Sequence, residues 1–153
     1  MRVVCCGTPY RGDDGAGLVV AERLLQLGIA VSTSTGEATD LLEAMSGTQE
    51  LLVVDAAITG APVGTIHEWH DLPTESRHNP FTGHALGVTT GIALARLMGK
   101  LPQRFRIFSI EAKTSEVGSQ ISDEVRRAAD ELAHRIAGLV LQAGRKISPI
   151  SNH

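Results

Sequence analysis

The chain has 153 residues, of which 42% are hydrophobic, so it has the length of one domain and can bury a substantial core. Its formal net charge of −3 provides no basic surface for nucleic acid, and no apolar run approaches the ~20 residues of a membrane span. We therefore expect a single domain with neither nucleic acid nor a membrane as its partner.

The N-terminal residues MRVVCCG contain no signal-peptide pattern. Cys5 and Cys6 are neighbours, and neighbours on a strand point to opposite faces, so they cannot easily bond each other. No cysteine spacing typical of a zinc site is present. This cysteine usage suits a reducing compartment and predicts a cytoplasmic protein.

Strand and helix patterns alternate along the first half of the chain. Apolar, β-branched runs indicate buried strands, and apolar residues at helical spacing indicate helices that end at glycines such as Gly28 and Gly47. Asp13 or Asp14 can cap the first helix. The predicted elements are strand 2–6, helix 13–28, strand 29–33, helix 38–47 and strand 51–54, which ends in Asp55.

The second half continues this alternation after a long loop. Residues 70–83 are rich in Pro, Ser, Thr and Asn, and loops of that length are often functional lids, so we expect this one to grip a substrate. We expect a domain over residues 1–144 and a loosely ordered tail over 145–153. The remaining predicted elements are edge strand 64–69, helix 84–99 with His84 in its first turn, strand 104–111, and helix 122–144 with Ser122 as its N-cap.

Alternating strands and helices, with strands too apolar to be half exposed, predict an α/β fold. We expect a single three-layer αβα domain around a mostly parallel sheet of about five strands. In such sheets ligands bind outside the carboxyl ends of the strands. Asp13 and Asp14 follow the first strand and Asp55 ends the third, so all three acids should lie at the same rim.

The segment CGTPYRGDD, residues 6–14, resembles a phosphate-binding loop in its glycine spacing only. Gly7 and Gly12 have the spacing of that loop, but Asp13 and Asp14 occupy the places of its Lys and its Ser or Thr. Two carboxylates would repel a phosphate. The loop therefore predicts a site for a cation.

Each candidate ligand also has a plainer interpretation. Asp14 could be a helix cap, Asp55 a turn residue, and His84 a hydrogen-bonded structural residue, although one cap would leave Asp13 unexplained. Together, two carboxylates and one imidazole at one rim would make a three-ligand site with room for an outside group. Such donors suit zinc or nickel, so Asp14, Asp55 and His84 are the predicted ligands.

Other nucleophiles and ligands have weaker support. The sequence has no G-x-S-x-G motif, which speaks against a serine hydrolase. Cys6 lies within an apolar strand and is better explained as a core thiol. Three further histidines could serve as a spare ligand or as a substrate contact: His67, His70 and His78.

Residues 3–24, VVCCGTPYRGDDGAGLVVAERL, resemble the N-terminal signature G-N-P-(x)-R-x-D-D-G-x-G of the [NiFe] hydrogenase maturation proteases. Segments similar to the later parts of that family follow in the same order, and the resemblance spans Arg2 to Ala143. Thr8 stands where the family usually has Asn. The later segments are LLVVDAA, GAPVGTIHEW, TGHALGVTTGIALARLMG and IFSIEAKTSEVGSQISDEVRRAADEL.

This resemblance implies an endopeptidase that removes a C-terminal extension from the precursor of a [NiFe] hydrogenase large subunit after nickel insertion. It implies that Asp14, Asp55 and His84 contact the metal. That metal would be the substrate's own nickel, with zinc or cadmium as a possible substitute in vitro. Either the metal activates water or the peptide carbonyl, or a carboxylate, Asp13 or Asp14, acts as the general base.

Two alternatives remain open from the sequence. A non-catalytic metal-sensing or assembly-partner module could use the same fold and the same three residues. A small-molecule hydrolase of similar architecture would need a phosphate or ribose site, which the acidic loop disfavours.

Overall fold

The computed structural model describes residues 1–71, 85–113 and 117–147, and these form alternating strands and helices around one sheet. A short 3-10 turn, Gly12–Gly15, precedes the first helix. The strands of this part of the chain are β1 (Arg2–Cys6), β2 (Ser32–Ser34), β3 (Glu50–Ala57), β4 (Ile66–Trp69) and β5 (Arg104–Glu111). The helices are α1 (Ala16–Gln26), α2 (Ala38–Met45), α3 (Ala85–Leu97) and α4 (Asp123–Ile147).

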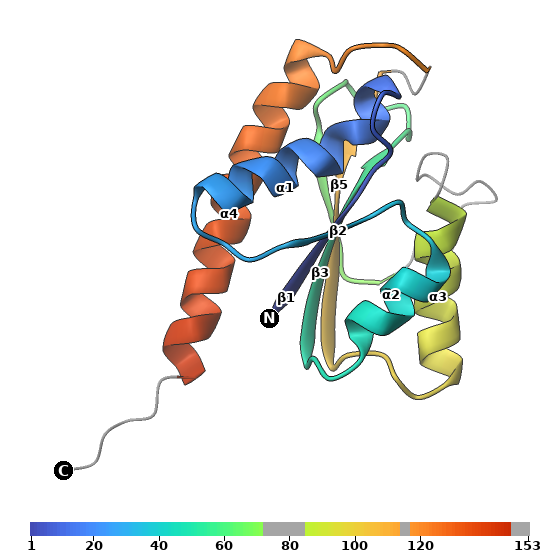
Figure 1. Ribbon diagram of the computed structural model, residues 1–153, viewed down its shortest axis with the longest axis vertical. Helices are drawn as coiled ribbons and strands as arrows, with labels where there is room; N and C mark the ends of the chain where they lie inside the picture. Colours follow the sequence, from blue (N-terminus) through green and yellow to red (C-terminus); the bar gives the residue numbers. More distant parts are fainter. Residues whose placement is uncertain (72–84, 114–116, 148–153) are drawn as a thin grey trace.

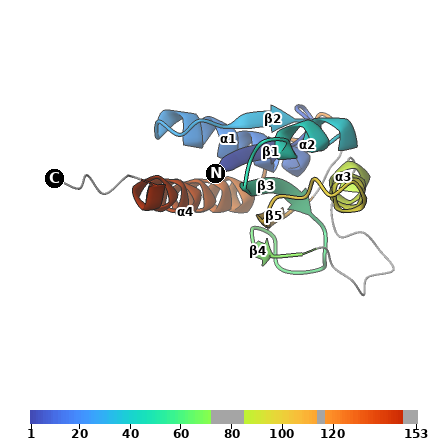
Figure 2. The ribbon, with the colours of Figure 1, turned by 90° about the horizontal axis from the view of Figure 1, so that it is seen from below.

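The sheet has the strand order β2-β1-β3-β5-β4. Strands β2, β1, β3 and β5 pair in parallel, and β4 is antiparallel to β5 at the edge. Helices α1 and α4 cover one face and α2 and α3 cover the other, as Figures 1 and 2 show. This confirms the predicted α/β fold, a three-layer domain around a mostly parallel five-stranded sheet.

The core has two parts because the side chains of each strand alternate between the two faces. Val3 and Cys5 pack with α1 and α4, whereas Val4 and Cys6 pack with α2 and α3. Both faces are covered, so the central strands are almost continuously apolar. This explains why strands 2–6 and 104–111 are predicted at the residues where they form.

The strand prediction for residues 29–33 is wrong at its first three positions. The N–H of Ile29 donates to the carbonyl oxygen of Leu24 (2.9 Å), and the N–H of Gly28 donates to that of Leu25 (3.0 Å). With Gly28 at φ 78°, this is a Schellman ending for α1, with Ile29 as its buried apolar contact. The β2 strand therefore begins only at Ser32.

Helix α4 begins after Ser122, as expected, but continues three residues beyond the predicted end at Gly144, to Ile147. A glycine near a helix end does not stop the helix when nothing else interrupts the backbone hydrogen bonds. The last six tail residues and nearly all of the predicted substrate-gripping loop lie outside the described residues, so both remain predictions. No helix within the described ranges is long and apolar enough to cross a membrane.

Gly17 sets how closely α1 approaches the sheet. A Cβ atom built on Gly17 would lie 2.0 Å from the carbonyl oxygen of Cys6 and 3.0 Å from its carbonyl carbon. These atoms are backbone and cannot move aside as a flexible side chain can. The first turn of α1 therefore lies directly against the end of β1, which places the preceding acidic loop at the rim of the sheet.

We expect Gly17→Ala to destabilise the protein by about 1–3 kcal/mol or more, because α1 must move away from β1. The matched control is Gly138→Ala, on an exposed part of α4 where no atom lies within 4 Å of the built Cβ. That change should stabilise the protein by about 0.5–1 kcal/mol through helix propensity. Urea unfolding of both variants checks this, and equal effects would contradict the close-approach argument.

Candidate active site

Asp55 lies within β3 and not at its end, which corrects the prediction. The strand continues to Ala57 because its pairing with β5 extends to Glu111, and Asp55 itself lies opposite Ser109. Its neighbours Val53 and Ala57 belong to the core beneath α2 and α3. Since strand residues two apart share a face, the Asp55 side chain points to that same face, near the carboxyl end of the sheet.

Neither Asp13 nor Asp14 caps α1, which also differs from the prediction. Both lie in the 3-10 turn Gly12–Gly15, and the N-cap of α1 is Gly15, without a side-chain cap. The turn buries both acids, with exposed fractions of 0% for Asp13 and 4% for Asp14. Their burial requires another source of stabilisation, and the two acids differ in what provides it.

The Asp13 carboxylate joins the acidic loop to the segment between β5 and α4. Its Oδ2 accepts a hydrogen bond from the N–H of Lys113 (2.7 Å). Its Oδ1 accepts from the N–H of Ser122 (2.8 Å), and the Ser122 hydroxyl donates to both oxygens (3.0 and 3.1 Å). Because these donors engage both oxygens, Asp13 acts as an anchor and is poorly suited to the role of general base.

Backbone contacts join the same two segments. The N–H of Gly12 donates to the carbonyl oxygen of Ser119 (3.0 Å), and the N–H of Gly118 donates to that of Tyr10 (2.7 Å). Tyr10 has φ 65°, a conformation that bulky residues rarely adopt. The contacts on either side of Arg11 therefore hold the loop in a shape that its own sequence does not favour.

Asp14 and Asp55 form an electrostatically unfavourable pair. Burial raises the pKa of Asp55, the N–H of Ala56 opposes this by donating to its Oδ1 (2.8 Å), and the Asp14 charge raises the pKa further. The net result is a pKa well above the usual range of an aspartate. A cation between the two carboxylates would relieve both their repulsion and the cost of burying them.

The Cys6 thiol lies close enough to Asp55 to feel its charge. Burial raises its pKa, and the charges of Asp55, Cys5 and Asp40 raise it further, well above the ordinary value. Asp40 was not among the predicted site residues, and its Oδ2 accepts a hydrogen bond from the Ser34 hydroxyl (2.9 Å). A buried thiol with a raised pKa is inert, which supports Cys6 as a core residue.

The predicted third ligand, His84, lies outside the described residues. Within the described ranges, no group of three His, Cys, Asp or Glu side chains is arranged to hold a metal ion. Helix α3 begins at the next residue, Ala85, and packs with α2 on the face to which Asp55 points. The structure thus brings Asp14 and Asp55 together, while the ligand role of His84 stays a prediction.

Glu111 is a further buried acid at this rim that the sequence pattern did not single out. It is 2% exposed and accepts hydrogen bonds from the Thr59 N–H (2.7 Å), the Thr59 hydroxyl (3.0 Å) and the Gly60 N–H (2.9 Å). Burial would raise its pKa, but these bonds and one from His67 hold it below the usual value. Glu111 is therefore ionised, and only its position at the end of β5 could have indicated a role.

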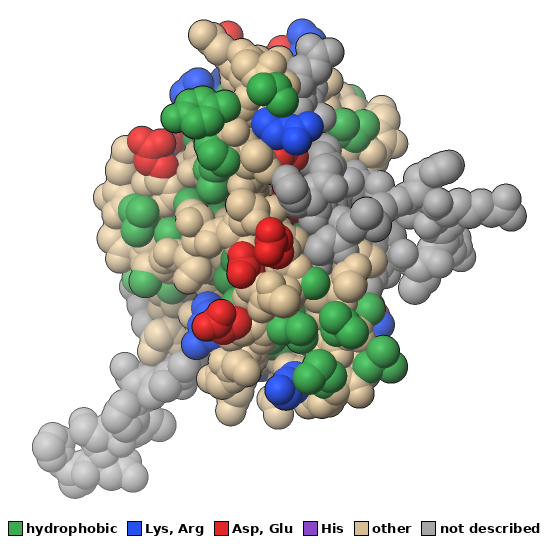
Figure 3. Space-filling view, turned by 45° about the vertical axis from the view of Figure 1, so that its right-hand side comes forward, with side chains coloured by type: hydrophobic (Ala, Val, Ile, Leu, Met, Phe, Trp, Pro, Cys, Tyr) green, Lys and Arg blue, Asp and Glu red, His purple; other side chains and the backbone are tan. Residues whose placement is uncertain are grey.

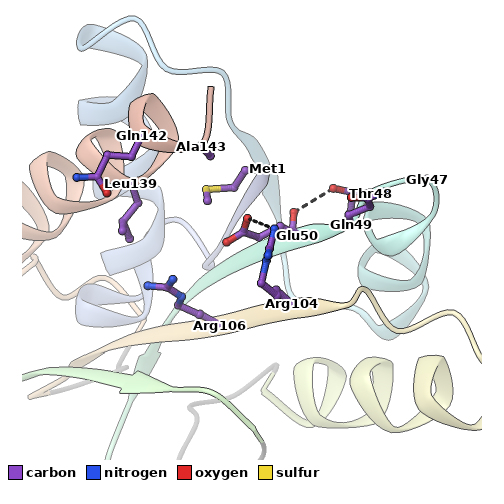
Figure 4. A pocket seen from close by; sticks show the side chains of 10 residues that line it. All are labelled: Met1, Gly47, Thr48, Gln49, Glu50, Arg104, Arg106, Leu139, Gln142 and Ala143. Carbon is purple, nitrogen blue, oxygen red and sulfur yellow. Dashed lines mark hydrogen bonds and ion pairs between the residues drawn. The ribbon is translucent and has the colours of Figure 1, made fainter. Parts of the chain in front are cut away.

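A cavity of about 530 Å³ lies at the opposite end of the sheet, where β3 and β5 begin (Figure 4). Its arginines are already paired, Arg104 with Glu50 (3.5 Å) and Arg106 with Glu68 (3.2 Å). None of the rim acids lines it. The residues that line it are Met1, Gly47, Thr48, Gln49, Glu50, Arg104, Arg106, Leu139, Gln142 and Ala143.

The face covered by α2 and α3 presents acidic and apolar side chains side by side (Figure 3). Three exposed apolar residues of α3 and the turn after it are Leu94, Leu97 and Met98. Surface of this kind suits contact with another protein better than with a small polar molecule.

The hydrogenase maturation protease family model matches residues 35–139 of the chain. A search of curated protein sequences found no match. Among solved structures, the chain is similar to the hydrogenase maturating endopeptidase HybD from Escherichia coli, with a TM-score of 0.76, 20% identity and 94% of each chain covered. An endopeptidase from the same organism gives a TM-score of 0.78 at 18% identity, again over 94% of each chain.

The [NiFe] hydrogenase maturation protease HybD from Thermococcus kodakarensis is similar at a TM-score of 0.72 and 25% identity, over 92% of this chain and 99% of that one. At 20% and 18% identity, the two Escherichia coli structures show a shared fold only. The match of this chain to the family model is a separate result, because it comes from the sequence. The match covers 94–99% of each of these three structures.

We expect Asp13→Asn to destabilise the protein by about 1–3 kcal/mol. The new NH2 group would face backbone N–H groups, and it cannot accept their hydrogen bonds. The control is Asp123→Asn, which changes an exposed acid in the first turn of α4 and should cost only about 0.3–1 kcal/mol. Urea unfolding compares the two variants. Equal losses would argue against the anchoring role of Asp13.

Asp55→Asn should make the protein more stable at neutral pH. The pKa of Asp55 is higher in the folded than in the unfolded state, so ionisation costs stability as the pH rises from about 3.9 through the raised value. The uncharged amide avoids this cost, and its advantage should disappear at pH 3. Thermal unfolding across pH 3–8 measures this, and an advantage that does not change with pH would contradict the argument.

Proposed function

The chain belongs to the hydrogenase maturation protease family and is a peptidase, and from this we propose its substrate: the nickel-loaded precursor of a [NiFe] hydrogenase large subunit. In this proposal the enzyme removes a C-terminal extension from that precursor. The absence of a zinc-type cysteine pattern and the two reduced, buried thiols support a cytoplasmic site of action.

The observation that carries the proposal is the buried pair Asp14 and Asp55. Two buried carboxylates that repel each other at the carboxyl rim of a parallel sheet are stabilised in their ionised form when a divalent cation binds between them. We infer that the substrate's nickel docks on Asp14, Asp55 and His84. An imidazole with two carboxylates is a donor set that nickel accepts.

Docking of the metal would let the enzyme distinguish a finished precursor from an unfinished one. Only a precursor that already carries nickel would supply the cation that relieves the repulsion between the acids. The same contact would hold the scissile peptide at the rim and convert a bimolecular search into a fixed geometry. The bound metal can polarise a carbonyl or a water molecule.

The residues around the metal site have separate tasks in this scheme. Asp13 holds the loop, and Cys6 belongs to the buried core beneath the site. The apolar surface of α3 provides area for the body of the precursor. Zinc or cadmium, if present in vitro, should compete with the substrate's nickel for the acids.

The test is proteolysis of a purified large-subunit precursor, with and without nickel. Wild-type protein should remove the extension only from the nickel-loaded form. Asp14→Ala, Asp55→Ala and His84→Ala should each lower the rate by roughly 10²-fold or more. The control Asp123→Ala changes an exposed acid in the first turn of α4 that has no role in the proposed site, and it should leave the rate unchanged.

The outcomes of this test distinguish the nickel-dependent peptidase from the non-catalytic metal-sensing or assembly module. Nickel-independent cleavage by wild-type protein would refute recognition through the metal. Normal cleavage by a folded variant of Asp14, Asp55 or His84 would refute the role of that residue. Binding of a nickel-loaded precursor without any cleavage would favour the metal-sensing or assembly module.

A further inference from the structure

His67 and Glu111 form a hydrogen-bonded pair at the same rim. The Nε2 atom of His67 lies 3.2 Å from Oε2 of Glu111. The Glu111 carboxylate is almost completely buried, whereas the His67 side chain is 22% exposed. A buried carboxylate therefore supports an imidazole that is partly exposed to solvent.

The hydrogen bonds to Glu111 determine which nitrogen of His67 carries the proton. Burial raises the pKa of Glu111, but hydrogen bonds from Thr59, His67 and Gly60 hold it below its usual value, so the group is an ionised acceptor. The Nε2 atom of His67 must then be the donor. In the neutral ring, Nδ1 is left as a proton acceptor. The two ring nitrogens thus have the reverse of their roles in the Ser-His-Asp triad, where Nδ1–H faces the carboxylate and Nε2 takes the proton.

Trp69 fixes the imidazole from the side. The two rings are 5.7 Å apart between centroids at an angle of 39°. The Trp69 Nε1–H donates a hydrogen bond to the Ser109 hydroxyl (3.0 Å), which holds the indole in place. The charged side chains of Glu68 and Arg106 pair with each other on the strands' opposite face, so Glu111 is the acid that orients His67.

The sheet register places His67 in the same row as Asp55. Ser109 lies opposite Asp55 on one side and opposite His67 on the other. All three side chains point to the face covered by α2 and α3. Two strand spacings of ~4.8 Å put the Cα atoms of Asp55 and His67 roughly 10 Å apart, a span that a short piece of extended peptide bridges.

We propose that His67 is the residue that transfers the proton during peptide hydrolysis, with Glu111 as the residue that positions it. This inference rests on the proposed function. In the step, Nδ1 of His67 takes a proton from water while the water oxygen bonds to the peptide carbonyl carbon. The C–N bond then breaks, and Nδ1 returns the proton to the leaving amine nitrogen, so the imidazole ends neutral.

The other candidates for this step are less suitable. Asp13 uses both carboxylate oxygens to hold the Lys113–Ser122 segment. Cys6 is a buried thiol with a strongly raised pKa. Asp14 and Asp55 are the proposed contacts of the substrate's nickel, and a metal-bound carboxylate is a poor base.

The experiment uses the full chain and nickel-loaded precursor, with the variants His67→Gln, His67→Ala and His134→Gln. The glutamine at position 67 can still donate to Glu111 but has no titrating nitrogen. We expect His67→Gln to lower kcat about 10²- to 10³-fold with KM within about two-fold of wild type. His134→Gln, an exposed histidine that contacts Asp130 on α4, should cleave normally.

Added imidazole should restore part of the activity of His67→Ala, because the side chain is partly exposed and the free ring can enter the space it leaves. A residue that only stabilised the edge strand would show neither this rescue nor the isolated loss of kcat. The positioning role has its own readout. Nitrogen-15 spectra should show that the neutral ring of His67 carries its proton on Nε2 in wild type. In Glu111→Gln they should show a mixture of the two tautomers.

Wild-type cleavage together with full activity of folded His67→Gln would overturn the role of His67 alone. A single unchanged tautomer in Glu111→Gln would overturn the positioning role of Glu111. Failure of wild-type protein to cleave any nickel-loaded precursor would overturn the proposed function, and with it this proton-transfer role.

Discussion

The hydrogen bonds of the Asp13 carboxylate determine the shape of the rim on which the site depends. They join the acidic loop to donors that lie 100 and 109 positions further along the chain. Asp13 and Asp14 therefore have different roles: Asp13 holds the loop in place, and Asp14 faces Asp55. Asp13 is satisfied by backbone N–H groups and a hydroxyl, and this fixes the turn that presents Asp14 toward Asp55. A loop with one acid could do only one of these things.

The rest of the fold supports a site that is unfavourable in isolation. Asp55 is buried beside a second carboxylate, and its raised pKa records the cost. The compensation comes from the apolar central strands and from the close approach of α1 to β1 at Gly17. Enzymes often hold functional groups in unfavourable surroundings at the expense of stability. A cation bound between the acids, as proposed, would lower this cost.

The sequence predicts most of the architecture because periodicity and burial are local patterns. Strands 2–6 and 104–111, and the shared rim of Asp14 and Asp55, follow from apolar runs and from the rule for parallel sheets. The anchoring of Asp13 and the His67–Glu111 pair could not be predicted, since their partners are distant in sequence. Asp55 lies inside β3 because pairing with β5 continues past it, and a single strand's pattern cannot show where its neighbour ends.

The sheet tapers toward both edges: β2 has three residues and β4 has four, whereas the inner strands β3 and β5 have eight. Outer strands this short offer few unpaired backbone groups to another chain. An extended polypeptide drawn to the rim therefore finds little edge on which to add itself as a further strand. Release of a cleaved fragment would then not require the separation of an added strand from the described sheet.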